Sequence, residues 1–137
     1  MNRMIFVNLP VKDLKVSMSF FQALGWTFNP TYTNDDAACL VISDTIYVML
    51  LKEDFYKSFT HKEIPDTKVY SEVIMALSAD SREDVDILVD KAFAAGATYY
   101  NDPQVYDFMY SRSFQDPDQH LWEVVYMEEV KPEEDQK

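Results

Sequence analysis

The stretch FQDPDQHLWEVVY, residues Phe114–Tyr126, predicts a hairpin corner followed by a strand. In the corner Asp116–Gln119, Pro117 fixes φ and the aspartates can accept hydrogen bonds from nearby backbone amides, which favours a tight turn. The segment Leu121–Tyr126 is rich in β-branched and aromatic residues, so we interpret it as a well-buried strand. One carboxylate, Glu123, stands among these apolar neighbours. Because burying an unpaired charge is costly, its presence there requires an explanation.

The residues before this corner predict a strand, a helix and two further strands. The helix starts at Ser81, where Asp84 completes a weak capping box, and it ends at Gly96. Its buried face repeats at helical spacing, with Val85, Leu88, Val89 and Ala92. We expect the strands at Tyr70–Leu77, Ala97–Asn101 and Tyr106–Gln115.

The first half of the chain predicts the same order of elements. Asp13 is a candidate helix N-cap, an apolar stripe follows it at helical spacing, and Gly25 stands where a left-handed C-cap belongs. Pro10 ends the preceding strand or confines it to a sheet edge. We expect strands at Met4–Leu9, Trp26–Tyr32, Ala37–Ile42 and Thr45–Leu51, and one or two helical turns within Lys52–Phe59.

The two halves together predict an α+β fold of two paired βαβββ modules, in which Phe6 corresponds to Ile74 and Met49 to Glu123. Each module packs its helix on the outer face of a concave mixed sheet, and the other face is left free to wrap a ligand. We assign one domain to residues 1–137. Module one covers residues 4–60, module two covers residues 70–127, and residues 128–137 form a flexible acidic tail.

The hairpin FQDPDQHLWE, residues 114–123, resembles the closing element of the vicinal oxygen chelate superfamily, which has the form F-x-D-P-D-G-x-x-W-E. That superfamily includes glyoxalase I, extradiol dioxygenases, fosfomycin-modifying enzymes and bleomycin resistance proteins. The front of the chain, Val7–Leu14 followed by Phe20, Phe21 and Gly25, is similar to the family's first strand, first helix and helix-ending glycine. The departure is Gln119, which stands where the family has glycine. If this position needs a positive φ, a residue with a Cβ costs about 1 kcal/mol there.

Composition limits the classes of partner. The net charge of −12 would repel the phosphates of a nucleic acid. An acidic surface either serves solubility alone or steers a cationic ligand. The single cysteine, Cys39, cannot form an intramolecular disulfide and is expected to be a small core residue. We find no signal peptide and no membrane-spanning run, so we predict a cytoplasmic protein with neither nucleic-acid nor membrane partners.

The resemblance implies up to four metal-ligand positions on the concave face, on the first and last strands of each module. These positions correspond here to Phe6, Met49, Ile74 and Glu123. A divalent metal prefers imidazole or carboxylate ligands, and Glu123 alone supplies one. A shift of one residue in register does not change this, because the neighbouring residues are apolar as well. We therefore expect a cleft with no metal and no cofactor.

The histidines do not suggest another metal site. In the spacing His120-x-x-Glu123, residues three apart on a strand point to opposite faces and cannot chelate together. We interpret His120 as a turn residue, and His61 lies in a polar linker without a sequence-local partner. A nucleophile motif and a phosphate-cradling glycine loop are both lacking in this chain, which has two glycines.

Strand alternation places mostly aromatic and apolar side chains on the concave face. The candidate ligand cleft consists of Phe6, Asn8, Tyr47, Met49, Ile74, Tyr110, Arg112 and Glu123. Arg112 could pair with Glu123 or with an anionic ligand, or it could simply neutralise a neighbouring acid. Glu123 is accordingly either a ligand-binding carboxylate or a structural partner of Arg112.

These observations predict a metal-independent small-molecule binding protein of the glyoxalase/bleomycin resistance type, with an aromatic or cationic organic ligand. One alternative is an enzyme, a glyoxalase-like lyase or dioxygenase with an atypical metal site around Glu123. Another is an interaction module whose cleft is filled by Phe6, Met49 and Ile74. The resemblance also implies a homodimer, because single-domain members of that family commonly complete their clefts across a two-fold interface.

Overall fold

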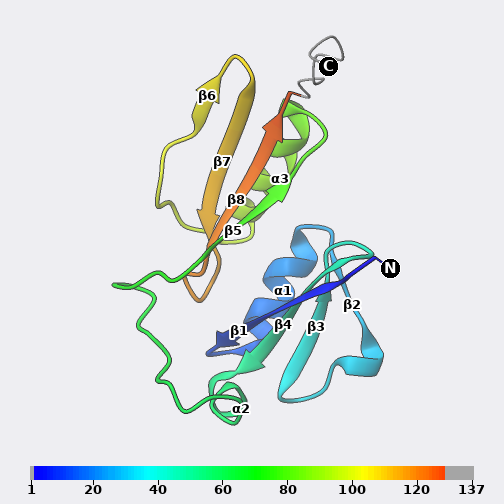
Figure 1. The fold of residues 1–137 in the computed structure, drawn as a ribbon, viewed down its shortest axis with the longest axis vertical. Coiled ribbons are helices and arrows are strands. Elements are labelled where there is room, and N and C mark those ends of the chain that lie inside the picture. Colours follow the sequence, from blue (N-terminus) through cyan, green and yellow to red (C-terminus); the bar gives the residue numbers. More distant parts are fainter. Residues whose placement is uncertain (1, 129–137) are drawn as a thin grey trace, which may run out of the picture.

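Two βαβββ modules follow each other along the chain, stacked along the long axis of the molecule (Figure 1). The computed structural model describes residues 2–128. Module one consists of β1 (Ile5–Val11), α1 (Leu14–Ala23), β2 (Thr27–Phe28), the 3-10 turn η1 (Pro30–Tyr32), β3 (Ala37–Val41) and β4 (Ile46–Lys52), followed by the short helix α2 (Glu53–Tyr56). Module two consists of β5 (Ile74–Ser78), α3 (Arg82–Ala94), β6 (Gln104–Tyr106), β7 (Met109–Gln115) and β8 (Leu121–Met127).

Each module forms one four-stranded mixed sheet, and the two sheets share one topology. The strand order is β1-β4-β3-β2 in module one and β5-β8-β7-β6 in module two. The first strand of each module runs parallel to the last, β1 to β4 and β5 to β8, while the remaining pairs are antiparallel. The predicted α+β fold of two βαβββ modules is therefore confirmed, and Pro10 lies in the edge strand β1.

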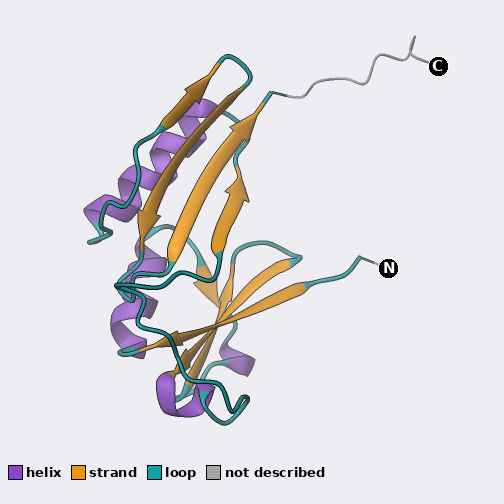
Figure 2. Cartoon of the chain, turned by 60° about the vertical axis from the view of Figure 1, so that its left-hand side comes forward, coloured by secondary structure: helices purple, strands orange, loops and turns teal. Residues whose placement is uncertain are grey.

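The helices begin and end at the residues that the sequence indicated. Asp13 caps α1 by accepting hydrogen bonds from two backbone amides of its first turn, and the Ser81 hydroxyl accepts one from the amide of Asp84. Gly25 and Gly96 follow the two helices with φ values of 101° and 109°, a region that favours glycine. Both helices lie on the same side of the sheets (Figure 2), which leaves the opposite sheet faces open.

An aromatic cluster joins the two modules on the helix side. Trp122 of β8 lies 5.4 Å from Phe21 of α1 and 6.0 Å from Trp26, measured between ring centroids. Phe114 of β7 stacks on Trp122 and lies 6.1 Å from Phe20. These rings are large and mostly buried, so they contribute much of the apolar area that holds one module against the other.

The turn Asp116–His120 is organised around a buried carboxylate. The side chain of Asp116 is 4% exposed and accepts hydrogen bonds from the backbone amides of Asp118 (2.9 Å) and His120 (3.0 Å) and from the Trp122 indole (3.0 Å). Burial raises the pKa of this carboxyl group. The tight turn predicted from Asp116–Gln119 is confirmed by the Gln119 amide, which donates to the Asp116 carbonyl at 2.8 Å.

The same turn also binds module one. The Asp118 carboxylate accepts hydrogen bonds from the Lys12 amide (2.9 Å) and the Ser17 hydroxyl (3.0 Å), and the His120 Nε2 lies 2.7 Å from the Pro10 carbonyl oxygen. His120 is thus a turn residue, as expected, with a structural role. Together with the aromatic cluster, these contacts fix the orientation of the two sheets.

Several strand boundaries differ from the sequence predictions. The strand expected at Trp26–Tyr32 shrinks to β2, because Asn29 and Pro30 start the 3-10 turn η1. Ala97–Asn101 forms one isolated bridge, at Thr98, and the third strand is β6 instead, which a turn at Asp107 separates from β7. Tyr70–Val73 lies outside β5.

Other predictions have a simpler outcome. The proposed tail, residues 128–137, lies outside the described residues except for Glu128. Cys39 is buried, which fits a small core residue. Within residues 2–128, the helices are all too short or too polar to cross a membrane.

Candidate functional site

The open face of the first sheet carries aromatic and apolar side chains at the predicted positions. Phe6 lies opposite Tyr47 and Asn8 lies opposite Met49 in the parallel pairing of β1 with β4. The rings of Phe6 and Tyr47 stack with their centroids 4.8 Å apart. Phe6 is 47% exposed, whereas the alternate residues of β1, Leu9 and Val11, are buried against the helix. The face is thus available for contact with another molecule.

The open face of the second sheet carries Glu123. Leu121 and Glu123 of β8 lie opposite Ile74 and Ala76 of β5, while Trp122 and Val124 point into the core. This is the alternation that the sequence predicted. Ile74 is 54% exposed and Glu123 is half-buried.

The structure corrects the prediction for Tyr110 and Arg112. In the pairing of β7 with β8, Arg112 lies opposite Val124 and Tyr110 opposite Tyr126, on the helix side of the sheet. Glu123 instead lies opposite Ser113. The turn Asp116–His120 sets this register, so the two residues belong to the face that packs against α3. The hypothesis that they line the cleft with Glu123 is therefore wrong.

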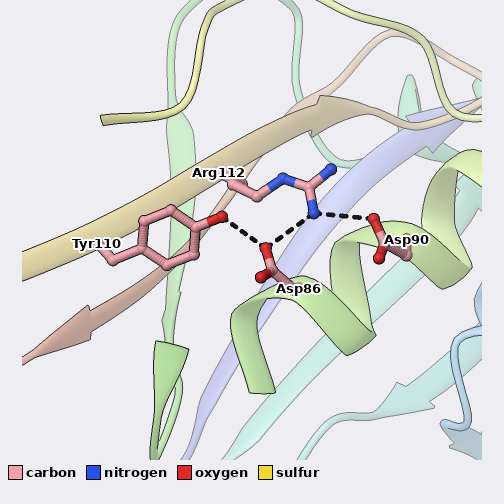
Figure 3. Close-up of polar contacts among 4 residues, drawn as sticks. All are labelled: Asp86, Asp90, Tyr110 and Arg112. Atoms are coloured by element: carbon pink, nitrogen blue, oxygen red, sulfur yellow. Dashed lines mark hydrogen bonds and ion pairs between the residues drawn. The ribbon is translucent and has the colours of Figure 1, made fainter. Parts of the chain in front are cut away.

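Arg112 finds its partners on α3 (Figure 3). Its guanidinium contacts Asp86 at 3.0 Å and Asp90 at 2.8 Å, and the Tyr110 hydroxyl donates to Asp86 at 2.5 Å. The hydrogen bond from Tyr110, and then the hydrogen bond and charge of Arg112, hold the pKa of Asp86 below its usual value. Arg112 thus neutralises neighbouring acids, which was one of the interpretations open from the sequence, and it does not pair with Glu123.

Two residues near Glu123 were missed by the sequence analysis. Ser113 lies directly across from Glu123 and is 9% exposed. The hydroxyl of Tyr100 donates to the Trp122 carbonyl at 3.2 Å. Burial raises the pKa of Tyr100, and the nearby charge of Glu123 raises it further, although a hydrogen bond with Ser113 opposes the increase. Alternation along β7 could have indicated Ser113, but Tyr100 lies in an irregular segment that carries no such signal.

The side chains around Glu123 do not form a donor set for a divalent metal. Within residues 2–128, the structure contains no group of three or more His, Cys, Asp or Glu side chains that could hold a metal ion. His120 and Glu123 do not come together, since His120 lies in the turn and contacts the Pro10 carbonyl, while Glu123 lies on the open sheet face. The neighbours of Glu123 are hydroxyl and apolar groups, which are poor metal ligands.

Two cavities lie where the linker between the modules passes the turn Asp116–His120. The larger has a volume of about 710 Å³ and is lined by both histidines, His61 and His120, together with lysines and carboxylates of mixed charge. The smaller, of about 240 Å³, reaches Asn8 and Leu121. The Thr67 hydroxyl donates to the Asp118 carbonyl at 2.6 Å and thereby holds the linker against the turn.

Comparison with protein families finds one match, in the first third of the chain. Residues 3–43 match the family model described as bleomycin resistance protein-like N-terminal. This segment covers β1, α1, β2 and β3. Among curated proteins, none matches the chain significantly.

Solved structures match over nearly the whole chain. A hypothetical protein from S. aureus is 27% identical with a TM-score of 0.76, and the match covers 92% of this chain and 95% of that one. A glyoxalase/bleomycin resistance protein/dioxygenase family enzyme from Burkholderia phytofirmans is 20% identical, with a TM-score of 0.76 and coverages of 89% and 96%. The fosfomycin resistance protein from Mesorhizobium loti is 15% identical, with a TM-score of 0.66 and 92% of each chain covered. At 20% and 15% identity, the last two matches show a shared fold only.

Proposed function

We propose that this chain, which belongs to the glyoxalase/bleomycin resistance/dioxygenase superfamily, binds a small organic molecule on the open faces of its sheets and does so without a metal ion. The ligand class is aromatic or cationic. The residues that we assign to the binding face are Phe6, Asn8, Tyr47, Met49, Ile74 and Glu123. Tyr110 and Arg112 lie on the helix side of the sheet and do not belong to this face.

The observation that carries the proposal is a carboxylate without a protein cation on the open face of the second sheet, together with the aromatic and apolar side chains on the open face of the first sheet. Arg112 forms the ion pairs found among the described residues, and both of them go to α3. Glu123 is therefore free to bind a positively charged group. The stacked rings of Phe6 and Tyr47 supply the flat apolar surface that an aromatic ligand would need.

The chemistry of the same face supports binding without a metal. The positions that hold metal in related folds are occupied by a phenyl ring, a thioether and a branched alkane at Phe6, Met49 and Ile74. These groups do not coordinate hard divalent cations, and one carboxylate alone anchors such an ion weakly. Phe6 and Ile74 also stay about half exposed, so they do not close into a packed layer within one chain.

We further propose that two copies associate into a homodimer that covers the open faces. The support is the exposure of large apolar side chains there, Phe6 on β1 and Ile74 on β5. Burying such side chains favours association. A cleft completed by the partner copy would also enclose a ligand better than one open sheet can.

The methyl group of Met49 offers a direct test of binding. Protein labelled with ¹³C on the methionine methyls would be titrated with 1-naphthylmethylamine, a cationic aromatic probe, and with neutral 1-naphthalenemethanol. We expect the Met49 resonance to shift in a saturable way for at least one of them, because Met49 lies on the binding face. Met18, which packs against the core on α1, is the internal control. If neither compound moves the Met49 resonance at millimolar concentration, the proposal is wrong.

The metal question needs a separate measurement. Purified tag-free protein would be analysed for bound metal, and its melting temperature recorded with and without added Ni²⁺, Zn²⁺, Mn²⁺ and Fe²⁺. We expect no stoichiometric metal and no rise beyond a few degrees. Stoichiometric metal would contradict metal-independent binding and would call for an enzyme assay.

A further inference from the structure

Three polar side chains gather on the open face of the second sheet, and they come from different parts of module two. Glu123 lies on β8 and Ser113 lies opposite it on β7, where directly paired residues have Cβ atoms about 5 Å apart. Tyr100 comes from the segment between α3 and β6, and its hydroxyl lies 3.2 Å from the carbonyl of Trp122, the residue that precedes Glu123. We call Tyr100, Ser113 and Glu123 the acceptor cluster.

Both hydroxyl groups of the acceptor cluster use their protons within the protein. The Tyr100 hydroxyl donates to the Trp122 carbonyl at 3.2 Å. The one proton of the Ser113 hydroxyl is shared between two acceptors of the protein, the Asn101 carbonyl at 3.4 Å and the Tyr100 oxygen. A hydroxyl has one proton and two lone pairs, so each oxygen can still accept a hydrogen bond. The ionised carboxylate of Glu123 only accepts. The cluster therefore presents acceptors from three side chains and no spare donor.

Two of the three cationic side chains of module two bind other groups of the module, and the third lies on α3. Arg112 binds Asp86 and Asp90, and the Arg82 guanidinium donates to the carbonyls of Tyr106 and Asp107. The remaining one, Lys91, lies in the last turn of α3. The acceptor cluster thus has a negative charge and a set of lone pairs that its own module does not neutralise.

Building on the proposed function, we propose that the acceptor cluster recognises a protonated primary or secondary amine of the ligand and discriminates against a quaternary ammonium group. An ammonium N–H can donate to Glu123 and to a hydroxyl oxygen at the same time, in charge-assisted hydrogen bonds. A quaternary ammonium has the charge but no N–H. It would leave half-buried acceptors without a partner, and such unpaired groups produce strong discrimination.

The test compares three probes on the same protein: 1-naphthylmethylamine, its N,N,N-trimethyl derivative and neutral 1-naphthalenemethanol. Dissociation constants would be measured from the Met49 methyl resonance and by titration calorimetry. We expect the primary amine to bind about tenfold more tightly than the quaternary compound, as hydrogen bonds to a charged group imply. Because the ratio is measured on unmodified protein, it does not depend on how well a variant folds.

Variants then locate the preference. Glu123→Gln should abolish the preference for the amine over the quaternary compound, and Tyr100→Phe and Ser113→Ala should each reduce it. The matched controls are Glu128→Gln and Tyr99→Phe, since Glu128 follows β8 and the Tyr99 hydroxyl donates to Asp102. Both controls should keep the unmodified ratio.

The outcomes separate this inference from the proposed function. Equal binding of amine and quaternary compound, or a preference that survives Glu123→Gln, would overturn the role of the acceptor cluster while leaving small-molecule binding intact. Binding of none of the three probes would overturn both.

Discussion

The backbone of Gln119 has a φ of 62°, in the left-handed region where a Cβ crowds the following carbonyl. This residue stands in the turn that connects β7 with β8 and that binds module one. The superfamily pattern that the hairpin resembles has glycine at this position, and glycine adopts a positive φ readily. The turn tolerates the strain because Asp116 fixes the backbone on both sides of it through the amides of Asp118 and His120.

We predict that Gln119→Gly raises the free energy of unfolding by about 0.5–1 kcal/mol. Glycine removes the left-handed penalty, although the greater freedom of the unfolded chain offsets part of the gain. Urea denaturation of the two proteins measures the difference. The control is Gln119→Ala, which shortens the side chain and keeps the Cβ. Equal stability of the glycine and alanine variants would show that strain at this residue is negligible.

At the scale of elements, α3 is fastened to β7 by a polar cluster as well as by its apolar face. Val85, Val89 and Ala92 of α3 are buried in the core. On the flank, Asp86 accepts hydrogen bonds from both Tyr110 and Arg112. Since the Asp86 side chain is 46% exposed, solvent screens the ion pair and its contribution is modest.

We predict that Asp86→Asn lowers the free energy of unfolding at pH 7 by less than about 1 kcal/mol, after allowing for that screening. The pKa of Asp86 is lowered in the folded protein, so its stabilising effect is present above the unperturbed aspartate pKa of 3.8. The effect is lost as the pH falls through the folded pKa. Urea denaturation at a series of pH values measures the free energy of unfolding of both proteins. The difference between wild type and Asp86→Asn should shrink toward zero as the pH falls from neutral to strongly acidic.

The control for this charge change is Asp35→Asn, in the exposed loop before β3. It should leave the stability nearly unchanged at every pH. A difference between wild type and Asp86→Asn that persists in strong acid would contradict the electrostatic explanation.

At the scale of the whole molecule, the two open sheet faces are the surfaces through which we expect two copies of the chain to associate. Phe6 and Ile74 are exposed on the first strands of the two modules. We predict a dimer in sedimentation velocity at micromolar concentration, weakened by Phe6→Glu and by Ile74→Glu because each places a charge among apolar groups. The control is Val16→Glu, at an exposed apolar position on α1. A monomer at all concentrations, or equal weakening by the control, would contradict association through the open faces.

The sequence by itself determined the order and type of most elements. The apolar stripe between Asp13 and Gly25, and the alternation of Leu121–Tyr126, are local patterns with the periods of a helix and a strand. The alternation along β8 predicts that the side chains of Glu123 and Trp122 point to opposite faces of the sheet. The strand predictions that were wrong concern irregular segments such as Ala97–Asn101, which pairs with β7 at Thr98 alone and does not continue as a ladder.

The tertiary structure alone decided which side chains meet. Alternation shows that Arg112 and Glu123 each point to one face or the other, but the length and geometry of the turn between β7 and β8 determine that these faces are opposite. Likewise, the contact of Asp118 with Lys12 and Ser17 joins residues more than a hundred positions apart. Tyr100 reaches the Trp122 carbonyl, next to Glu123, from an irregular segment. Such contacts depend on how whole elements pack, which no local period encodes.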